Sequence, residues 1–237
     1  MNASSPEQHK VGAIIVAAGS STRMGGVDKI FALLDGRPLL LRAIDVFERC
    51  SAVDSIVLVT AEGQSLWDAA RMVEQQTQWR KVRSVKAGGP RRQDSVALGL
   101  SVLPPCEWVV VHDGARPLVE PELIVRGLEA VVETGAAIAG VPAKDTVKVV
   151  GKEGKVESTP DRHGLWMVQT PQVFSRQLLE RAHREVTVDV TDDAAMVERL
   201  GGDVRVFMGS YRNIKVTTPE DLLVAASLLD PFLLEEG

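Results

Sequence analysis

The sequence is poor in cysteine: its 237 residues include two, Cys50 and Cys106, which lie far apart and belong to no CxxC pair or metal-ligand spacing. Paired cysteines are typical of oxidising compartments, so we interpret both as incidental thiols of a reducing one. The sequence also lacks a run of the ~18 apolar residues that a membrane span needs, and the opening MNASSPEQHK has no apolar segment of the kind found in signal peptides. We therefore expect a cytoplasmic protein.

An excess of positive charge is absent as well. The formal net charge is -5, from 27 Lys and Arg against 32 Asp and Glu, which argues against a protein whose whole surface binds nucleic acid or lipid. An anionic ligand must therefore meet a local cluster of cations. The hydrophobic fraction of 45% is typical of a globular chain that folds unaided.

Short β-branched runs alternate with amphipathic stretches of helical length. The predicted strands are Val11–Ala17, Ser55–Thr60, Lys81–Lys86, Trp108–Val111, Ala136–Val141 and Val204–Phe207, and the predicted helices are Leu39–Arg49, Leu66–Gln76, Arg92–Val102 and Glu122–Glu133. This alternation, with nearly continuous apolar strands, predicts an α/β fold with a doubly wound, mostly parallel, Rossmann-like sheet in a single domain over residues 1–237. Thr218, Pro219 and Asp221 predict the start of a closing helix that packs on the sheet.

The alternation breaks after Pro142. Thr146–Val150 and Lys155–Thr159 flank a Gly-Lys-Glu-Gly turn, which predicts a β-hairpin. A two-stranded hairpin is marginally stable by itself, so this one must pack on its own domain or on another copy of the chain. We interpret the segment at about 142–165 as an arm used in dimerisation.

The segment IIVAAGSSTRMGGVDK, residues 14–29, runs from a strand through a loop of small residues, an arrangement that binds anions through free backbone N–H groups. It fits neither standard phosphate loop: GxGxxG fails two residues after Gly19, and the P-loop fails because Met24 stands where its second glycine belongs. Arg23 and Lys29 remain at the two ends of the loop, where a triphosphate would need positive charge. The alternative is a glycine-rich turn with surface cations.

Three further segments carry candidate site residues. In AGGPRRQDSV, the paired glycines that end at Gly89 let a flat base approach the backbone, and Ser95 offers a hydroxyl to its edge. In WVVVHDGARP, Asp113 ends a strand at the edge where ligands bind in such sheets and is suited to Mg²⁺, while Arg116 is placed to bind a phosphate. RNIKV supplies Lys215. Each segment also has a purely structural interpretation: a tight turn into a helix for AGGPRRQDSV, a structural strand end for WVVVHDGARP and a solvated lysine for RNIKV.

In chain order these segments resemble the 2-C-methyl-D-erythritol 4-phosphate cytidylyltransferase family, nucleotidyltransferases that use CTP in the non-mevalonate isoprenoid pathway. The opening loop alone is similar to that of the nucleoside-diphosphate-sugar pyrophosphorylase-like enzymes. The resemblance runs from about residue 11 to 230 and lies in AAGxxxRM, GGxxRxxSV, VHDxARP, DRxGLW, TPQ, TD and NIKVT. A set of motifs this long and in this order is stronger evidence for the resemblance than any one motif.

The resemblance implies a role for each matching residue. The residues implied to hold the cytidine are Ala17, Ala18, Gly19, Gly89 and Ser95. Those implied to act on the phosphates are Arg23, Lys29, Lys215 and Asp113, the last as the Mg²⁺ ligand. Those implied to bind the acceptor are Arg116, Thr170 and Thr191, together with Thr146 and Arg162, which the arm carries into the site of a partner subunit in a homodimer.

The implied reaction is in-line attack of 2-C-methyl-D-erythritol 4-phosphate on the α-phosphorus of CTP, which forms 4-diphosphocytidyl-2-C-methyl-D-erythritol and pyrophosphate. The attacking phosphate is already an anion, so the lack of a Ser-His-Asp or carboxylate-dyad arrangement is expected. Two alternatives stay open: a cytidylyltransferase for ribitol 5-phosphate or another polyol phosphate, and a non-catalytic nucleotide-binding protein. Arg212 stands where some relatives have an acidic residue, so a second carboxylate for Mg²⁺ is not provided there.

Overall fold

The computed structural model describes residues 10–19 and 29–229, which fold around a seven-stranded sheet of order β11-β7-β10-β6-β1-β4-β5. The strands are β1 (Val11–Ala17), β4 (Ser55–Thr60), β5 (Val82–Ala87), β6 (Trp108–Asp113), β7 (Ala136–Pro142), β10 (Trp166–Ser175) and β11 (Arg205–Met208). Strand β1 is parallel to both β4 and β6, whereas β10 is antiparallel to both of its neighbours. The predicted mostly parallel α/β fold is confirmed, with β10 as a strand that the apolar pattern did not predict.

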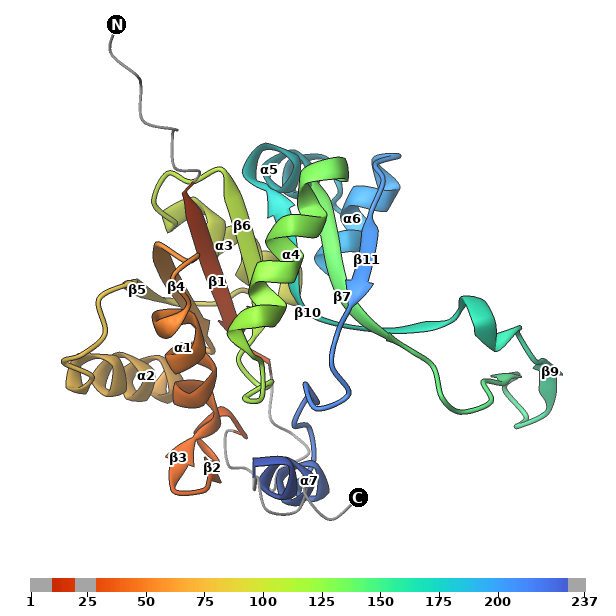
Figure 1. Ribbon diagram of the computed structural model, residues 1–237, viewed down its shortest axis with the longest axis horizontal. Coiled ribbons are helices and arrows are strands. Elements are labelled where there is room, and N and C mark those ends of the chain that lie inside the picture. The colour runs from red at the N-terminus through yellow and green to blue at the C-terminus, as the bar shows by residue number, and fades with distance from the viewer. Residues whose placement is uncertain (1–9, 20–28, 230–237) are drawn as a thin grey trace, which may run out of the picture.

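Helices cover both faces of the sheet (Figure 1). The helices are α1 (Leu39–Arg49), α2 (Gln64–Gln75), α3 (Arg92–Val102), α4 (Pro121–Thr134), α5 (Arg176–Glu185) and α6 (Asp193–Arg199). Ala13 and Ile15 of β1 pack with α1, α2 and α4 in one core cluster, while Ile14 and Val16 pack with α3, α5 and α6 in the other. Alternate side chains of one strand thus enter two cores, which is why the strand is apolar throughout. Among the described residues, no helix is long and apolar enough to cross a membrane.

Helix α3 lies unusually close to the sheet. A Cβ atom at Gly99 would come within 2.6 Å of Ile14 Cγ2 in β1 and 3.1 Å of Val59 Cγ2 in β4. The glycine therefore sets the distance between helix and sheet. With this spacing, the first turn of α3 lies over the carboxyl ends of the central strands, where the site is built.

The closing helix α7 (Pro219–Leu229) forms as predicted but packs elsewhere. Asp221 Oδ2 accepts the backbone N–H groups of Thr217 and Thr218 at 2.7 and 2.9 Å, which caps the helix start. The apolar residues of α7 pack against Leu34 of β2 (Leu33–Leu34), which pairs with β3 (Arg37–Pro38), and against neighbouring segments. The expectation that α7 packs on the seven-stranded sheet is wrong, because α1 and α4 already cover the sheet face on that side (Figure 1).

The predicted hairpin projects from the body of the molecule (Figure 1). It contains β8 (Val149–Val150) and β9 (Val156–Ser158), followed by the 3₁₀ turn η2 (Arg162–Gly164). Both strands are shorter than the sequence pattern indicates, and every residue of both strands is exposed. Within a single chain the arm therefore buries none of its valines.

Candidate active site

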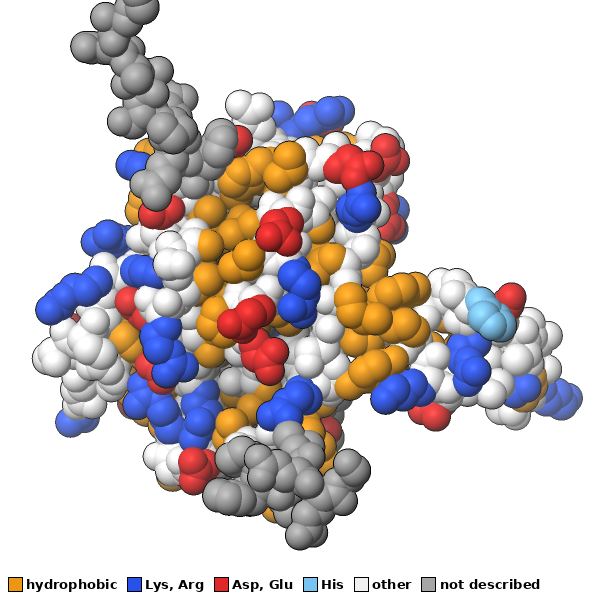
Figure 2. Space-filling model, viewed as in Figure 1, with side chains coloured by type: hydrophobic (Ala, Val, Ile, Leu, Met, Phe, Trp, Pro, Cys, Tyr) orange, Lys and Arg blue, Asp and Glu red, His pale blue; other side chains and the backbone are white. Residues whose placement is uncertain are grey.

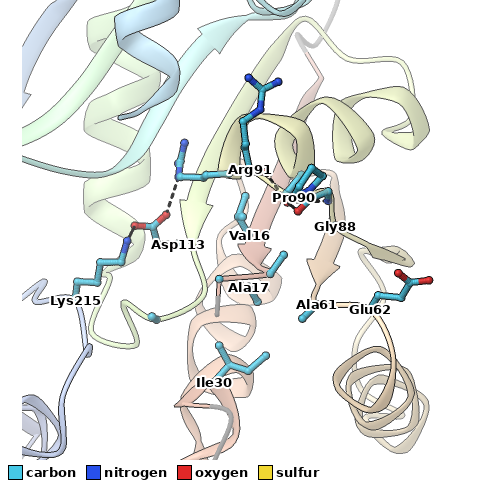
Figure 3. Close-up of a pocket in the computed structure, with 16 residues that line it drawn as sticks. Val16, Ala17, Ile30, Ala61, Glu62, Gly88, Pro90, Arg91, Asp113 and Lys215 are labelled. Atoms are coloured by element: carbon cyan, nitrogen blue, oxygen red, sulfur yellow. Dashed lines mark hydrogen bonds and ion pairs between the residues drawn. The ribbon is translucent and has the colours of Figure 1, made fainter. Parts of the chain in front are cut away.

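A cavity of about 730 Å³ lies at the carboxyl ends of the central strands (Figure 3). Segments far apart in the chain line it, namely the ends of β1 and β6, the residue pair after β4, the loop from β5 into α3, and Lys215. This is the edge of an open α/β sheet where ligands bind. The sequence expectation of a site at Asp113 therefore corresponds to a real hollow in the molecule.

One half of the cavity is formed mainly by backbone and small side chains. All five residues predicted to hold the nucleoside line it: Ala17, Ala18, Gly19, Gly89 and Ser95. A Cβ atom at Gly88 would come within 2.5 Å of the Ala18 Cβ atom, so the loops after β1 and β5 touch only because Gly88 has no side chain. The Gly89 N–H donates to Ser95 Oγ at 3.1 Å, which orders this loop. Such a flat, backbone-lined wall suits a planar base.

The other half of the cavity carries concentrated charge around Asp113, which is 7% exposed. Lys215 Nζ lies 2.9 Å from Asp113 Oδ2, and Arg92 Nε lies 3.3 Å from Asp113 Oδ1 (Figure 3). On the buried side, Arg116 Nε lies 3.7 Å from Oδ2. Asp113 thus pairs with three cations, and two of them, Lys215 and Arg92, line the space that a polyphosphate would fill.

The ionisation states of these groups are fixed at neutral pH. Burial opposes ionisation of Asp113, but Arg92, Lys215 and Arg116 outweigh it and hold the pKa of Asp113 well below its usual range. Burial likewise opposes the charge on Arg92, yet Asp193 and Asp113 raise its pKa above the usual value. The site therefore presents permanent charges.

Arg92 is a site residue for which the sequence predicted no role. Its Nη1 atom donates to Oδ2 of the buried Asp193 at 2.5 Å, and its Nε atom donates to Asp113. The neighbouring Arg91 also lines the cavity, and its Nη2 atom lies 2.6 Å from Asp94 Oδ1. The available sequence signal is the arginine of the motif GGxxRxxSV, which falls on Arg92, but no role was assigned to it.

Buried hydrogen bonds hold the backbone of Asp113 in place. Its N–H donates to Thr170 Oγ1 at 3.0 Å, and that hydroxyl lies 3.1 Å from His112 Nδ1. His112 Nε2 lies 3.2 Å from the Arg116 carbonyl oxygen. Burial lowers the pKa of His112 to about 4, so the ring is neutral at pH 7 and acts as a structural bridge. Thr170, predicted to line the acceptor side, is buried, does not line this cavity, and supports Asp113 instead.

The remaining predicted residues either lie outside the described part of the chain or do not line the cavity. Arg23 lies outside the described residues, and Lys29 begins the 3₁₀ turn η1 (Lys29–Phe31), with its side chain outside the described part. Thr146 and Arg162 lie exposed on the arm, and Thr191 lies exposed just before α6; none of these three lines the cavity. The arm residues extend away from their own chain's site (Figure 1).

Comparison with known proteins agrees with this geometry. A family model for 2-C-methyl-D-erythritol 4-phosphate cytidylyltransferase matches residues 11–231. Among curated relatives, that enzyme of Dehalococcoides mccartyi is 51% identical over 220 residues, covering 93% of this chain and 96% of the relative. That of Alkaliphilus metalliredigens is 44% identical, covering 93% of each chain.

Solved structures give the same result. The 4-diphosphocytidyl-2C-methyl-D-erythritol synthase of Anaerococcus prevotii superposes with a TM-score of 0.81 at 31% identity, over 94% of this chain and 99% of that one. The 2-C-methyl-D-erythritol 4-phosphate cytidylyltransferase of Thermus thermophilus superposes with a TM-score of 0.75 at 31% identity, over 92% and 98%. With sequence, fold and cavity in agreement, the chain belongs to the 2-C-methyl-D-erythritol 4-phosphate cytidylyltransferase family.

Proposed function

We propose that this chain transfers the cytidylyl group of CTP to 2-C-methyl-D-erythritol 4-phosphate, forming 4-diphosphocytidyl-2-C-methyl-D-erythritol and pyrophosphate in isoprenoid precursor synthesis. One observation carries the proposal: Lys215 and Arg92 meet at Asp113 beside a backbone-lined hollow in a single cavity. A nucleoside triphosphate needs both halves, the hollow for its base and the surplus charge for its phosphates.

The residues act by positioning and by neutralising charge. An acceptor phosphate oxygen forms a bond to the α-phosphorus of CTP, and the bond between that phosphorus and the bridging oxygen breaks, with its electron pair leaving on pyrophosphate. Lys215 is placed to neutralise charge on the phosphates, and Arg92 and Arg116 keep Asp113 in its ionised form. The attacking oxygen is already an anion, so no general base is required.

We propose Mg²⁺ as the cofactor, with Asp113 as its ligand. Among the described residues, no three His, Cys, Asp or Glu side chains form a metal-binding group. A single buried carboxylate fits an ion that is held mainly by the nucleotide phosphates, which is how proteins usually bind Mg²⁺. When bound, the ion would supply further neutralisation of phosphate charge. Arg23 and Lys29 remain predicted phosphate ligands.

We propose a homodimer in which each arm reaches the partner's cavity with Thr146 and Arg162. The arm valines are exposed, and the neighbouring Trp166, Met167 and Met208 extend an apolar surface at its base (Figure 2). Strands of two and three residues do not form a stable hairpin alone, and a surface of this kind is typical of an interface. Thr191 stays a predicted acceptor residue, and a cytoplasmic location stays a prediction.

Pyrophosphate release tests the function directly. We would supply CTP and Mg²⁺ with 2-C-methyl-D-erythritol 4-phosphate or ribitol 5-phosphate in parallel reactions. Release with the first acceptor alone is the expected result. Release with ribitol 5-phosphate alone would keep the CTP site and overturn the acceptor, and release with neither would favour the non-catalytic alternative.

A further inference from the structure

A second cavity, of about 370 Å³, lies away from Asp113 and is lined by arginines. The lining arginines are Arg37, Arg42, Arg49 and Arg212. They come from β3, from α1 and from the segment that leads to Lys215, so the chain brings them together from distant positions. Figure 2 shows Lys and Arg side chains gathered near α1 and the β2–β3 hairpin. We refer to this cavity as the arginine pocket.

The carboxylates of the arginine pocket do not balance its cations. Two carboxylates line it, those of Asp45 and Glu120, against four guanidinium groups. Asp45 already accepts three hydrogen bonds, because Arg37 donates to its two oxygens at 2.6 and 2.8 Å and Trp79 Nε1 donates to it at 3.0 Å. Arg42 in turn pairs with Asp35 at 3.2 Å, so Arg49 and Arg212 face one remaining lining carboxylate, that of Glu120.

The unbalanced charge lies on Arg49 and Arg212. Neither has a carboxylate partner among the residues that the structure describes. Arg212 is half-buried, and Nη2 donates to the Leu228 carbonyl oxygen at 2.6 Å; within the described part of the chain its other guanidinium N–H groups have no partner. Partial burial of a guanidinium without a counter-ion is costly, so the arrangement favours an anion that supplies one.

We propose that the arginine pocket binds a small anion bearing a phosphate or diphosphate group. Guanidinium groups bind such oxyanions through paired hydrogen bonds, and a site with this cation surplus suits a doubly charged group. The pocket shares no lining residue with the catalytic cavity. It does share chain segments with it, because Ala115 and Lys215 line one cavity while Pro117 and Arg212 line the other.

Inorganic diphosphate is the probe, added without divalent cations and followed by calorimetric titration of the full chain. The expected result is two diphosphate ions per chain, one in each cavity. In the double variant Arg49→Gln with Arg212→Gln, we expect one diphosphate per chain and unchanged CTP affinity. Arg49→Gln alone, which removes no hydrogen bond within the described structure, should weaken the second site about tenfold. Arg199→Gln, at the end of α6, is the matched control and should bind like the wild type.

The proposal is overturned if the double variant, folded by its melting curve, binds as many diphosphate ions as the wild type with the same affinities. It is also overturned if the wild type binds one diphosphate that CTP displaces completely. CTP affinity is measured separately in every variant. A chain that bound no CTP would count against the proposed function while the effect of the arginine substitutions on diphosphate binding could still be measured.

Discussion

Asp113 shows how a single buried carboxylate can arrange several cations before a substrate arrives. Lys215, Arg92 and Arg116 would repel one another in so small a volume without it, and each lies within 4 Å of its oxygens. Charges fixed in place before binding need little reorganisation during reaction, which is the basis of electrostatic catalysis in such sites. The carboxylate therefore has a role in positioning cations in addition to any role with a metal ion.

Lys215→Met should lower the turnover number by about 100-fold, because it removes a charge that neutralises the phosphates in the transition state. Steady-state pyrophosphate release is the measurement, with circular dichroism to show that the fold is kept. Lys10→Met is the matched control, since Lys10 precedes β1 at the opposite end of the strand from the cavity. Near-normal turnover in Lys215→Met would contradict the proposed role.

His112 should make the free energy of unfolding depend on pH. Burial lowers its pKa from 6.5 to about 4, so between these values the unfolded chain binds a proton that the folded chain does not. The stability from this group is therefore present above pH 6.5 and is lost as pH falls, by about 2 kcal/mol between pH 7 and 5. Urea unfolding of His112→Gln in EDTA should lack this loss, whereas His163→Gln, exposed on the arm, should keep it. Equal pH profiles for wild type and His112→Gln would contradict the prediction.

Seven of the sixteen residues that line the cavity were predicted, because their motifs are local. Gly89, Ser95 and Asp113 each stand in a short segment whose chemistry is visible without the rest of the chain. Arg92 could not be assigned a role, because its partner Asp193 lies 101 positions away and no local pattern pairs them. The hydrogen-bond partner of His112 was similarly invisible, since Thr170 lies 58 positions away.

At the scale of elements, strands with apolar side chains on both faces were predictable and β10 was not. The strands β1 and β4 match their predicted bounds. In β10, Gln169, Thr170 and Gln172 interrupt the apolar pattern, and Pro171 lies where the pairing with β7 shifts register. Proline and polar residues in sequence usually indicate a loop. Here the side chains of Gln169, Thr170 and Gln172 are buried because they form hydrogen bonds with Ser210, Asp113 and Asp192. A local pattern cannot show such distant partners.

Gly99→Ala should destabilise the protein even though alanine favours helices. Alanine gains about 1 kcal/mol of helix propensity over glycine. The added methyl group would meet Ile14 at 2.6 Å and Val59 at 3.1 Å, and overpacking of this kind costs about 1–3 kcal/mol. We expect a net loss of about 1 kcal/mol in urea unfolding. Gly164→Ala, whose Cβ meets nothing within 4 Å, is the control, and a stabilised Gly99→Ala would show that α3 can move outward.

At the scale of the whole molecule, the residue pattern predicts the hairpin, but only the family resemblance implies which site it enters. Residues 146 and 162 lie on an exposed arm, and Arg162 Nη1 donates to the Lys144 carbonyl oxygen on the same arm at 2.5 Å. No chain pattern determines where a projecting segment docks, because its partner is another molecule. The arm and the cavity are therefore separate parts of one chain whose proposed meeting requires a second copy.

Mixing two inactive variants tests whether the arm acts across subunits. Lys215→Met impairs the cavity and leaves the arm intact, whereas Arg162→Ala impairs the arm and leaves the cavity intact. If arms cross, a mixed dimer has one complete site, so random re-association of equal amounts should restore about one quarter of wild-type activity. The measurement is pyrophosphate release after subunit exchange, and each variant exchanged with itself is the control. Activity that stays at the level of the two variants, with mixed dimers shown by mass spectrometry, would mean that Arg162 does not complete the partner's site.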